Sequence, residues 1–168
     1  MHDTDILRDA FERVRDAVHP AANGLTVEEL GFRPDAESNS IAWLIWHLTR
    51  IQDDHVAELR GAPQVWADEG WAERFALPLD VSDTGYGHDA EAVASVTADA
   101  ASLLGYFEGV HEATVAYLGT ITVDDLDRVV DQHWDPPVTL GMRLVSVIAD
   151  DLQHVGQASY VRGIVQRR

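Results

Sequence analysis

The sequence contains no cysteine and no lysine: all 12 of its basic residues are arginine, against 29 aspartate and glutamate residues, for a net charge of −17. The absence of cysteine excludes disulfide bonds, a thiolate nucleophile and cysteine-ligated zinc or iron–sulfur sites within the chain. Any metal ion must then be held by histidine and carboxylate groups. The excess negative charge repels nucleic-acid phosphates and anionic membrane surfaces, so we expect neither as a partner.

Long apolar runs are also missing. The longest strongly apolar stretch, residues 41–46, is far shorter than the about 20 residues that span a bilayer, and the first residues are acidic where a secretion signal would be basic. We therefore expect a cytoplasmic protein. A hydrophobic share of 46% in 168 residues is typical of a globular chain, which predicts a single folded domain over residues 1–168.

Apolar residues recur at helical spacing in four long segments, and no segment shows the alternation typical of a strand. The predicted helices lie at about residues 6–18, 41–60, 89–118 and 139–165. Pro20 is expected to stop the first helix, the polar run 37–40 to cap the second, and Thr139 to cap the fourth. Four long helices without strands predict an all-α fold, a four-helix bundle.

The segment between the second and third predicted helices has no clean period. Residues 62–88 carry several glycines and prolines beside Trp66, Trp71 and Phe75. A long connection with aromatic residues is typical either of a lid over a site or of a packed surface loop with a helical turn of its own. The sequence does not decide between these two alternatives.

Ionisable side chains interrupt the apolar faces of two predicted helices. His47 lies in the middle of an apolar stripe. Asp150 and His154 stand four residues apart, about 6 Å along one helix face, a spacing at which two ligand-type residues can chelate one ion. Each feature has an ordinary alternative, because His47 also fits a hydrogen-bonded core residue, and Asp150 with His154 fits a surface pair.

Several other polar residues are expected to be structural or exposed to solvent. A structural or exposed position is expected for each of His2, His19, His88 and His111, and a solvated one for Asp54, Glu58 and Asp151. The tryptophans are expected to pack in the core and loops, with Trp134 as a candidate for lining a pocket mouth. Gly156 and Gly163 each cost about 1 kcal/mol in a helix relative to alanine, which suggests a close helix approach such as a dimer interface.

Three segments together resemble the DinB/YfiT-like metalloenzyme superfamily. Residues 39–48, with the sequence NSIAWLIWHL, are similar to the second-helix motif of that family. Residues 150–157, DDLQHVGQ, are similar to its fourth-helix motif, and residues 25–34 to the connector between its first two helices. The resemblance covers most of the chain in order and spacing, and leaves residues 62–88 unmatched.

The resemblance implies a four-helix bundle that holds a divalent metal ion through one ligand of the second helix and two of the fourth. In this sequence those ligands are His47, Asp150 and His154. The commonest pattern of the family has three histidines, and the similar mycothiol-dependent maleylpyruvate isomerases use a glutamate between two histidines. Two imidazoles and a carboxylate are compatible with zinc, iron(II), nickel or manganese.

Family members of known activity use such a metal with a small thiol, for example mycothiol or bacillithiol. The resemblance therefore implies an enzyme that activates a low-molecular-weight thiol for S-transfer or isomerisation of a small electrophilic substrate. Since the chain has no cysteine, the sulfur would have to come from a diffusible cofactor. His55, as a base or fourth ligand, and Gln157, as an orienting group, are the candidate catalytic residues. Tyr160 and Arg162 are candidates for cofactor binding.

Two other functional classes stay open at this point. One is a non-catalytic bundle, homodimeric or not, that binds a structural ion or a small ligand. The other is a metal-assisted hydrolase that uses water as the nucleophile.

Overall fold

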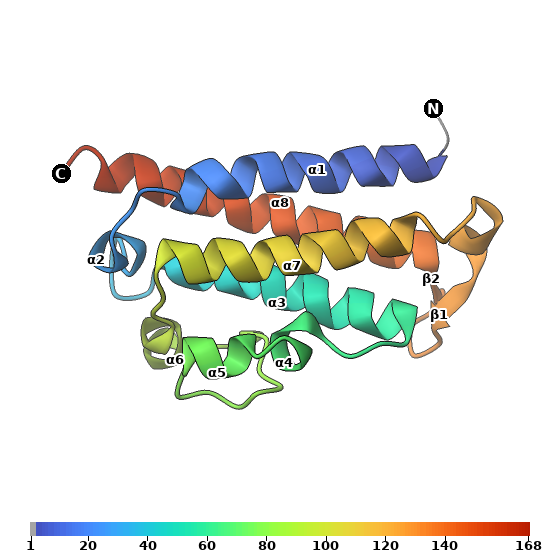
Figure 1. The fold of residues 1–168 in the computed structure, drawn as a ribbon, viewed down its shortest axis with the longest axis horizontal. Helices are drawn as coiled ribbons and strands as arrows, with labels where there is room; N and C mark the ends of the chain where they lie inside the picture. Colours follow the sequence, from blue (N-terminus) through green and yellow to red (C-terminus); the bar gives the residue numbers. More distant parts are fainter. Residues whose placement is uncertain (1–2) are drawn as a thin grey trace.

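The computed structural model describes residues 3–168, so His2 lies outside the described part (Figure 1). Its body is built by four long helices, which are α1 (Asp3–Ala22), α3 (Ile41–Arg60), α7 (Ala100–Leu118) and α8 (Leu140–Val165). The shorter elements are α2 (Val27–Leu30), α4 (Val65–Asp68), α5 (Trp71–Phe75), α6 (Ala90–Ser95), the 3₁₀ helix η1 (Asp124–Asp127), β1 (Val129–Asp131) and β2 (Val138–Thr139). The predicted all-α four-helix bundle is confirmed.

The long helices form a bundle in which each one has a parallel and an antiparallel neighbour. α1 and α8 run in one direction and α3 and α7 in the other (Figure 1). α3 packs against α8 and α7, and α1 packs against the same two helices. Buried apolar side chains fill the space between them. Within residues 3–168, no helix combines the length and the apolar character that a membrane span needs.

The helices that carry the candidate ligands begin and end where the sequence predicts. The hydroxyl of Ser40 accepts the backbone N–H of Trp43 at the start of α3, and Thr139 accepts that of Met142 at the start of α8. Gly61 closes α3 in the left-handed conformation, with φ of 61°. These caps satisfy backbone groups that a helix end leaves free.

The prediction that Pro20 stops the first helix is wrong by two residues. α1 continues to Ala22 with Pro20 in its last turn. There the missing N–H removes only one intrahelical hydrogen bond. Ala21 and Ala22 are almost fully buried in the core, and this packing favours the extra residues.

The third predicted helix is also interrupted. The chain leaves the helical conformation after α6, at residues 96–99, and α7 begins after Asp99. The Asp99 carboxylate accepts the backbone N–H of Ser102 and caps α7. Val93, Val96 and Leu103 are buried in the same core on either side of the break, so the apolar pattern continues through it.

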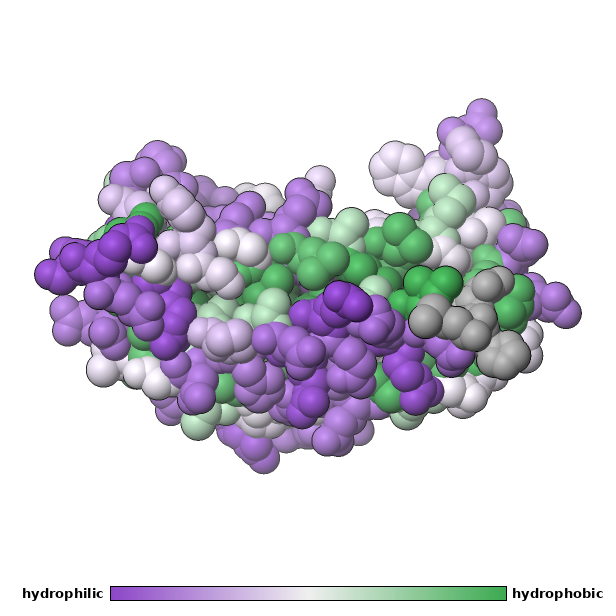
Figure 2. All heavy atoms as spheres, turned by 90° about the horizontal axis from the view of Figure 1, so that it is seen from above, coloured by the Kyte–Doolittle hydropathy of each residue, from purple (hydrophilic) through white to green (hydrophobic). Residues whose placement is uncertain are grey.

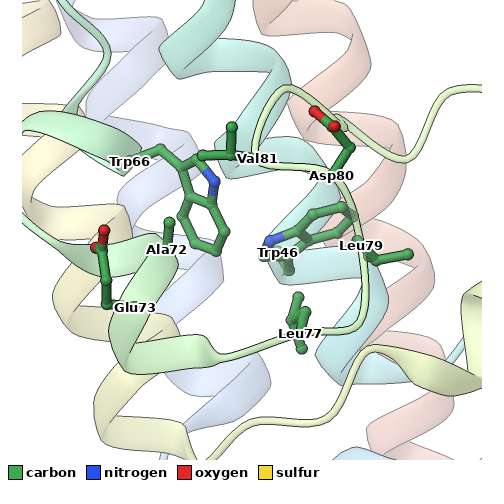
Figure 3. Close-up of a pocket in the computed structure, with 8 residues that line it drawn as sticks. All are labelled: Trp46, Trp66, Ala72, Glu73, Leu77, Leu79, Asp80 and Val81. Carbon is green, nitrogen blue, oxygen red and sulfur yellow. The ribbon is translucent and has the colours of Figure 1, made fainter.

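Residues 62–88 form a packed segment with two short helices, α4 and α5, which lies along α3 and α7 (Figure 1). Its anchor is the buried carboxylate of Asp53 on α3, which accepts the backbone N–H groups of Val65 and Trp66 and the hydroxyl of Tyr106. A cavity of about 240 Å³ is lined by the Trp46 and Trp66 rings and by side chains between Ala72 and Val81 (Figure 3). Of the two alternatives for this segment, the packed loop with helical turns describes it.

Candidate metal centre

α3 and α8 bring His47, Asp150 and His154 together. His47 stands on α3, while Asp150 and His154 stand one turn apart on α8, which runs in the opposite direction. One ligand atom of each residue lies within 4.8 Å of the others. An ion with bonds of about 2.1 Å holds its ligand atoms no more than about 4.2 Å apart, so the three side chains have to draw closer by a small amount to bind one. The arrangement therefore suits a single ion between the two helices.

His47 presents a neutral nitrogen to this site. Its ring is buried, and its Nδ1 lies 2.6 Å from the backbone oxygen of Thr84. Because a carbonyl only accepts, Nδ1 donates, and the lone pair is on Nε2. Burial lowers the pKa of His47, which outweighs the opposing effect of the Thr84 carbonyl. The ring also stacks on Trp43 with centroids 4.4 Å apart. His47 is thus fixed in the form in which imidazole binds metals.

His154 and Asp150 face each other across one helical turn. The His154 Nε2 lies 3.5 Å from Oδ1 of Asp150, and its Nδ1 lies 3.2 Å from Oε1 of Gln157. Because Gln157 accepts from Nδ1, the neutral ring turns its Nε2 lone pair toward the Asp150 carboxylate. This contact is repulsive unless Nε2 carries a proton, which then bonds Asp150, or a cation lies between the two groups. The hydrogen bond to Asp150 raises the pKa of His154. A proton and a metal ion therefore compete for the same place.

The Asp150 carboxylate is charged and incompletely paired. Burial by itself would raise the pKa of Asp150, but the hydrogen bond and charge of His154 outweigh it, and the pKa is lowered. Its second oxygen, Oδ2, is buried and has no hydrogen-bond partner. A buried anionic oxygen without a partner is costly, and a bound cation would remove that cost.

The loop after α5 supports His47 from the far side. Gly85 has φ of +89°, and a Cβ on it would lie 2.7 Å from Nδ1 of His47. Trp43 donates from Nε1 to Nδ1 of His88 at 3.1 Å, and Nε2 of His88 lies 2.9 Å from Oδ1 of Asp83. His88 is therefore structural, as predicted, but it is part of the support of the site. Thr84 and Gly85 are not among the predicted site residues, and their local signal in the sequence is the glycine content of this loop.

Of the two candidate catalytic residues, Gln157 contacts one of the three candidate ligands, His154. His55 lies two turns beyond His47 on α3 and is not part of the group of three. Its Nδ1 is buried without a partner, and burial lowers its pKa, while the charge of Asp150 acts in the opposite direction. The structure thus holds His55 neutral near the carboxylate of the site.

The two candidate cofactor-binding residues point in different directions. Tyr160 is 70% exposed and lines a groove of about 790 Å³ beside the site. Arg162 instead donates to the backbone oxygens of Ala21 and Asn23 at the end of α1. The structure does not bring Arg162 to the site, because position 162 faces α1.

The groove shares Gln157 with the candidate metal centre. The groove is lined by side chains of α8, of the start of α3 and of residues 34–39. These side chains belong to Pro34, Asp35, Glu37, Ser38, Asn39, Leu44, Gln153, Gly156, Gln157, Tyr160, Val161 and Ile164. No basic residue is among them. The groove therefore offers hydroxyl, amide and apolar contacts, with two carboxylates on one side.

The expectation of a solvated Asp151 is wrong. Its side chain is fully buried on the core face of α8, and neither of its oxygens has a partner. Burial raises its pKa well above the ordinary value, and the neighbouring Asp150 adds to the effect. Asp54 accepts a hydrogen bond from Gln64 and is partly buried, whereas Glu58 is exposed as expected.

Three other side chains outside the site can be placed. His19 pairs with Glu108, and His111 is buried beside Glu12. Trp134 is 67% exposed in the turn between β1 and β2, away from the groove. None of them contributes to the candidate centre.

The fold and the site define a four-helix bundle with a candidate His–Asp–His metal centre between two helices. The chain belongs to the DinB superfamily, whose profile matches residues 10–158. It is similar to a crystal structure described as a conserved protein from Enterococcus faecalis, with 32% identity, a TM-score of 0.93, and coverage of 100% of this chain and 99% of that one. No protein with a curated description matches the chain.

Proposed function

We propose that the protein is a divalent-metal-dependent enzyme that activates a low-molecular-weight thiol for S-transfer or isomerisation of a small electrophile in the cytoplasm. The observation that carries this proposal is the group of three ligand atoms within 4.8 Å of one another. Membership of the DinB superfamily, which includes many metalloenzymes, supports the same interpretation.

The residues present fit a divalent ion. Two imidazoles whose Nδ1 atoms are engaged by acceptors offer Nε2, and Asp150 offers an oxygen that has no other partner. His47, Asp150 and His154 would hold the ion, and three protein ligands leave positions for a reactant. When bound, such an ion acidifies a thiol or water at neutral pH.

The chain's other residues have roles consistent with thiol chemistry. His55 is held neutral by burial and is proposed to take the proton that the thiol loses. Gln157 orients His154 through Nδ1. The sulfur has to come from a diffusible molecule because the chain has no cysteine.

The groove beside the site suggests the chemistry of that thiol. Tyr160, Gln153 and Asn39 line it with hydroxyl and amide groups, and no arginine is present to pair with an acidic ligand. A neutral thiol rich in hydroxyl groups, such as mycothiol, suits this lining better than one that carries carboxylates.

The first test is the metal content of protein purified without a histidine tag. We expect about one divalent ion per wild-type chain and almost none in His154→Ala. His133→Ala is the matched control, because the His133 side chain is 96% exposed and outside the site. Wild-type protein that lacks stoichiometric metal under metal-replete growth contradicts the proposal.

The second part of the test is turnover of a generic electrophile with and without mycothiol. We expect consumption of the electrophile only when the thiol is added, and loss of this activity in His154→Ala. Equal rates without thiol would instead indicate a hydrolase that uses water. Stoichiometric metal with no turnover of any of several electrophiles would indicate a non-catalytic metal-binding bundle.

A further inference from the structure

The loop between α5 and α6 is held on the bundle by polar contacts. It lies on the side of the bundle away from α1 (Figure 1), whereas apolar side chains reach the surface as a strip on the opposite side, along α1 and α8 (Figure 2). Residues 81–88 of this loop include Thr84, whose carbonyl accepts from His47. The contacts that hold the loop therefore bear on the candidate metal centre.

The carboxylate of Asp83 makes two contacts through one oxygen. Its Oδ1 accepts the backbone N–H of Gly85 at 2.8 Å and lies 2.9 Å from Nε2 of His88. The first contact is a turn that aspartate forms with the residue two positions on, and it keeps Gly85 beside His47 with φ of +89°. Burial by itself would raise the pKa of Asp83, but the hydrogen bonds from Gly85 and His88 outweigh it, and the pKa is lowered. The carboxylate is therefore charged.

His88 connects this carboxylate to Trp43. Because an ionised carboxylate only accepts, Nε2 of His88 donates, and in the neutral ring Nδ1 is left to accept from Nε1 of Trp43 at 3.1 Å. The Trp43 ring stacks on His47 with centroids 4.4 Å apart, and it lies at 85° to the His154 ring with centroids 6.0 Å apart. One indole thus packs against both histidine ligands.

The backbone of Asp83 is held separately, by Arg50 on α3. Arg50 is fully buried, and its Nε donates to the backbone oxygen of Asp83 at 3.0 Å. Its Nη1 donates to Oε1 of Gln64 at 2.8 Å and lies 3.8 Å from the Asp53 carboxylate. Leaving a buried charge without its partners is costly. The loop is therefore fixed on α3 at the residue before Thr84.

We propose that Asp83 is a positioning residue of the candidate metal centre. Its carboxylate sets the face of Trp43 on which His47 stacks, and its backbone keeps the neighbouring carbonyl at Nδ1 of the same ring. Both contacts fix the imidazole in the tautomer that offers Nε2 to an ion. Asp83 is not one of the candidate ligands, so it acts through the orientation of His47. The inference rests on the proposed function in taking His47 as a metal ligand, but the ring can be observed without metal.

The tautomer of His47 in metal-free protein, measured by NMR of the labelled histidine rings, is the direct test. We expect the wild-type ring to be protonated at Nδ1. Asp83→Ala removes both hydrogen bonds of Oδ1, and His47 should then show a mixture of the two tautomers. Asp83→Asn keeps an oxygen in the place of Oδ1 and should restore the wild-type tautomer. A folded Asp83→Ala with an unchanged His47 tautomer overturns the proposal.

Asp80→Ala is the matched control in the same loop. Oδ1 of Asp80 accepts the backbone N–H and the hydroxyl of Ser82, so this carboxylate also closes a turn with the residue two positions on. The variant removes the same charge and the same kind of turn without the link to His88. We expect it to leave the tautomer of His47 unchanged. Equal effects of Asp80→Ala and Asp83→Ala would show a general loosening of the loop and overturn the role of Asp83.

A second variant tests the link through His88 by itself. His88→Phe keeps a ring beside Trp46, whose centroid lies 6.0 Å from that of His88, but it removes the acceptor of the Trp43 indole N–H. We expect this N–H to exchange with solvent faster than in the wild type. Exchange at the wild-type rate contradicts the proposal, and this result does not depend on whether Asp83→Ala folds.

Zinc affinity, measured by calorimetric titration, gives the functional consequence. We expect Asp83→Ala to bind zinc about 10-fold more weakly, at the lower end of the usual cost of losing an outer partner of a ligand. Asp83→Asn and Asp80→Ala should stay close to the wild type. A wild type that binds no zinc contradicts the proposed function, while the tautomer in metal-free protein still decides the role of Asp83. Equal zinc affinity of the wild type and a folded Asp83→Ala overturns the positioning role.

Discussion

The two helices that supply the candidate ligands do so in different ways. On α8, Asp150 and His154 meet because one helical turn separates them, so local geometry alone brings them together. On α3, His47 depends on a loop 37 residues further along the chain, where Thr84 accepts its Nδ1 proton. A pair within one helix can be predicted from spacing, whereas the orientation of a single ligand depends on the tertiary fold.

The sharpest way to break this comparison is to disturb the loop without touching a ligand. In Gly85→Ala the added methyl would lie 2.7 Å from Nδ1 of His47 and 3.0 Å from the Trp46 ring, so the His47 ring has to move. We expect zinc affinity, measured by calorimetric titration, to fall about 10- to 100-fold, which is the usual cost of losing an outer partner of a ligand.

Gly87→Ala is the matched control for that variant. Gly87 also has a positive φ, of +75°, in the same loop, but a Cβ there meets nothing within 4 Å. It therefore carries the backbone strain without the contact with His47. If both variants weaken zinc binding equally, the loop acts through its general stability and not through His47.

A smaller effect is expected on the α8 side. Gln157→Ala removes the acceptor of the His154 Nδ1 proton, but the helix still holds His154 one turn from Asp150. We expect zinc affinity to fall less than 10-fold in the same titration. The control Gln153→Ala removes an exposed amide that donates to the backbone oxygen of Ala149 on the same helix, and it should leave zinc affinity unchanged. A larger loss in Gln157→Ala than in Gly85→Ala would reverse the comparison.

The smallest expected effect is on stability, and it concerns Asp99, the residue that caps α7. Asp99→Ala removes the cap of α7 and should lower the free energy of unfolding by about 1 kcal/mol, while Asp99→Asn should retain most of it. The backbone hydrogen bond from Ser102 lowers the pKa of Asp99. The carboxylate therefore stabilises the fold above its unfolded pKa, and this contribution is lost as the pH falls through its folded value.

Urea denaturation at several pH values measures this difference. The gap between wild type and Asp99→Ala should be full at neutral pH and shrink in acid. A gap that stays constant down to pH 2 would show that the charge of Asp99 has no part in the capping.

The sequence predicted the bundle and the place of its candidate ligands well. The bounds of α3 and α8 follow from a clear apolar period, a hydroxyl cap at each start and Gly61 at the end of α3, all of which are local signals. The same period places His47 on the inner face of α3 and Asp150 with His154 on one face of α8. These three residues lie together because the two helices are antiparallel neighbours.

The features that the sequence did not predict depend on contacts between distant residues. The break before α7 is hidden because Val93, Val96 and Leu103 continue the apolar period in the same core. Asp151 is buried because it lies on the side of α8 that packs against the core. Its charge by itself predicts a solvated position. The support of His47 by Thr84 depends on a loop without any period.

The most direct test of the central claim is an anomalous difference map from crystals grown with zinc, collected at the zinc absorption edge. The account predicts one strong peak per chain within bonding distance of His47, Asp150 and His154, with the two histidines bound through Nε2. No peak between α3 and α8 at saturating zinc, or a peak held by other residues, would contradict it.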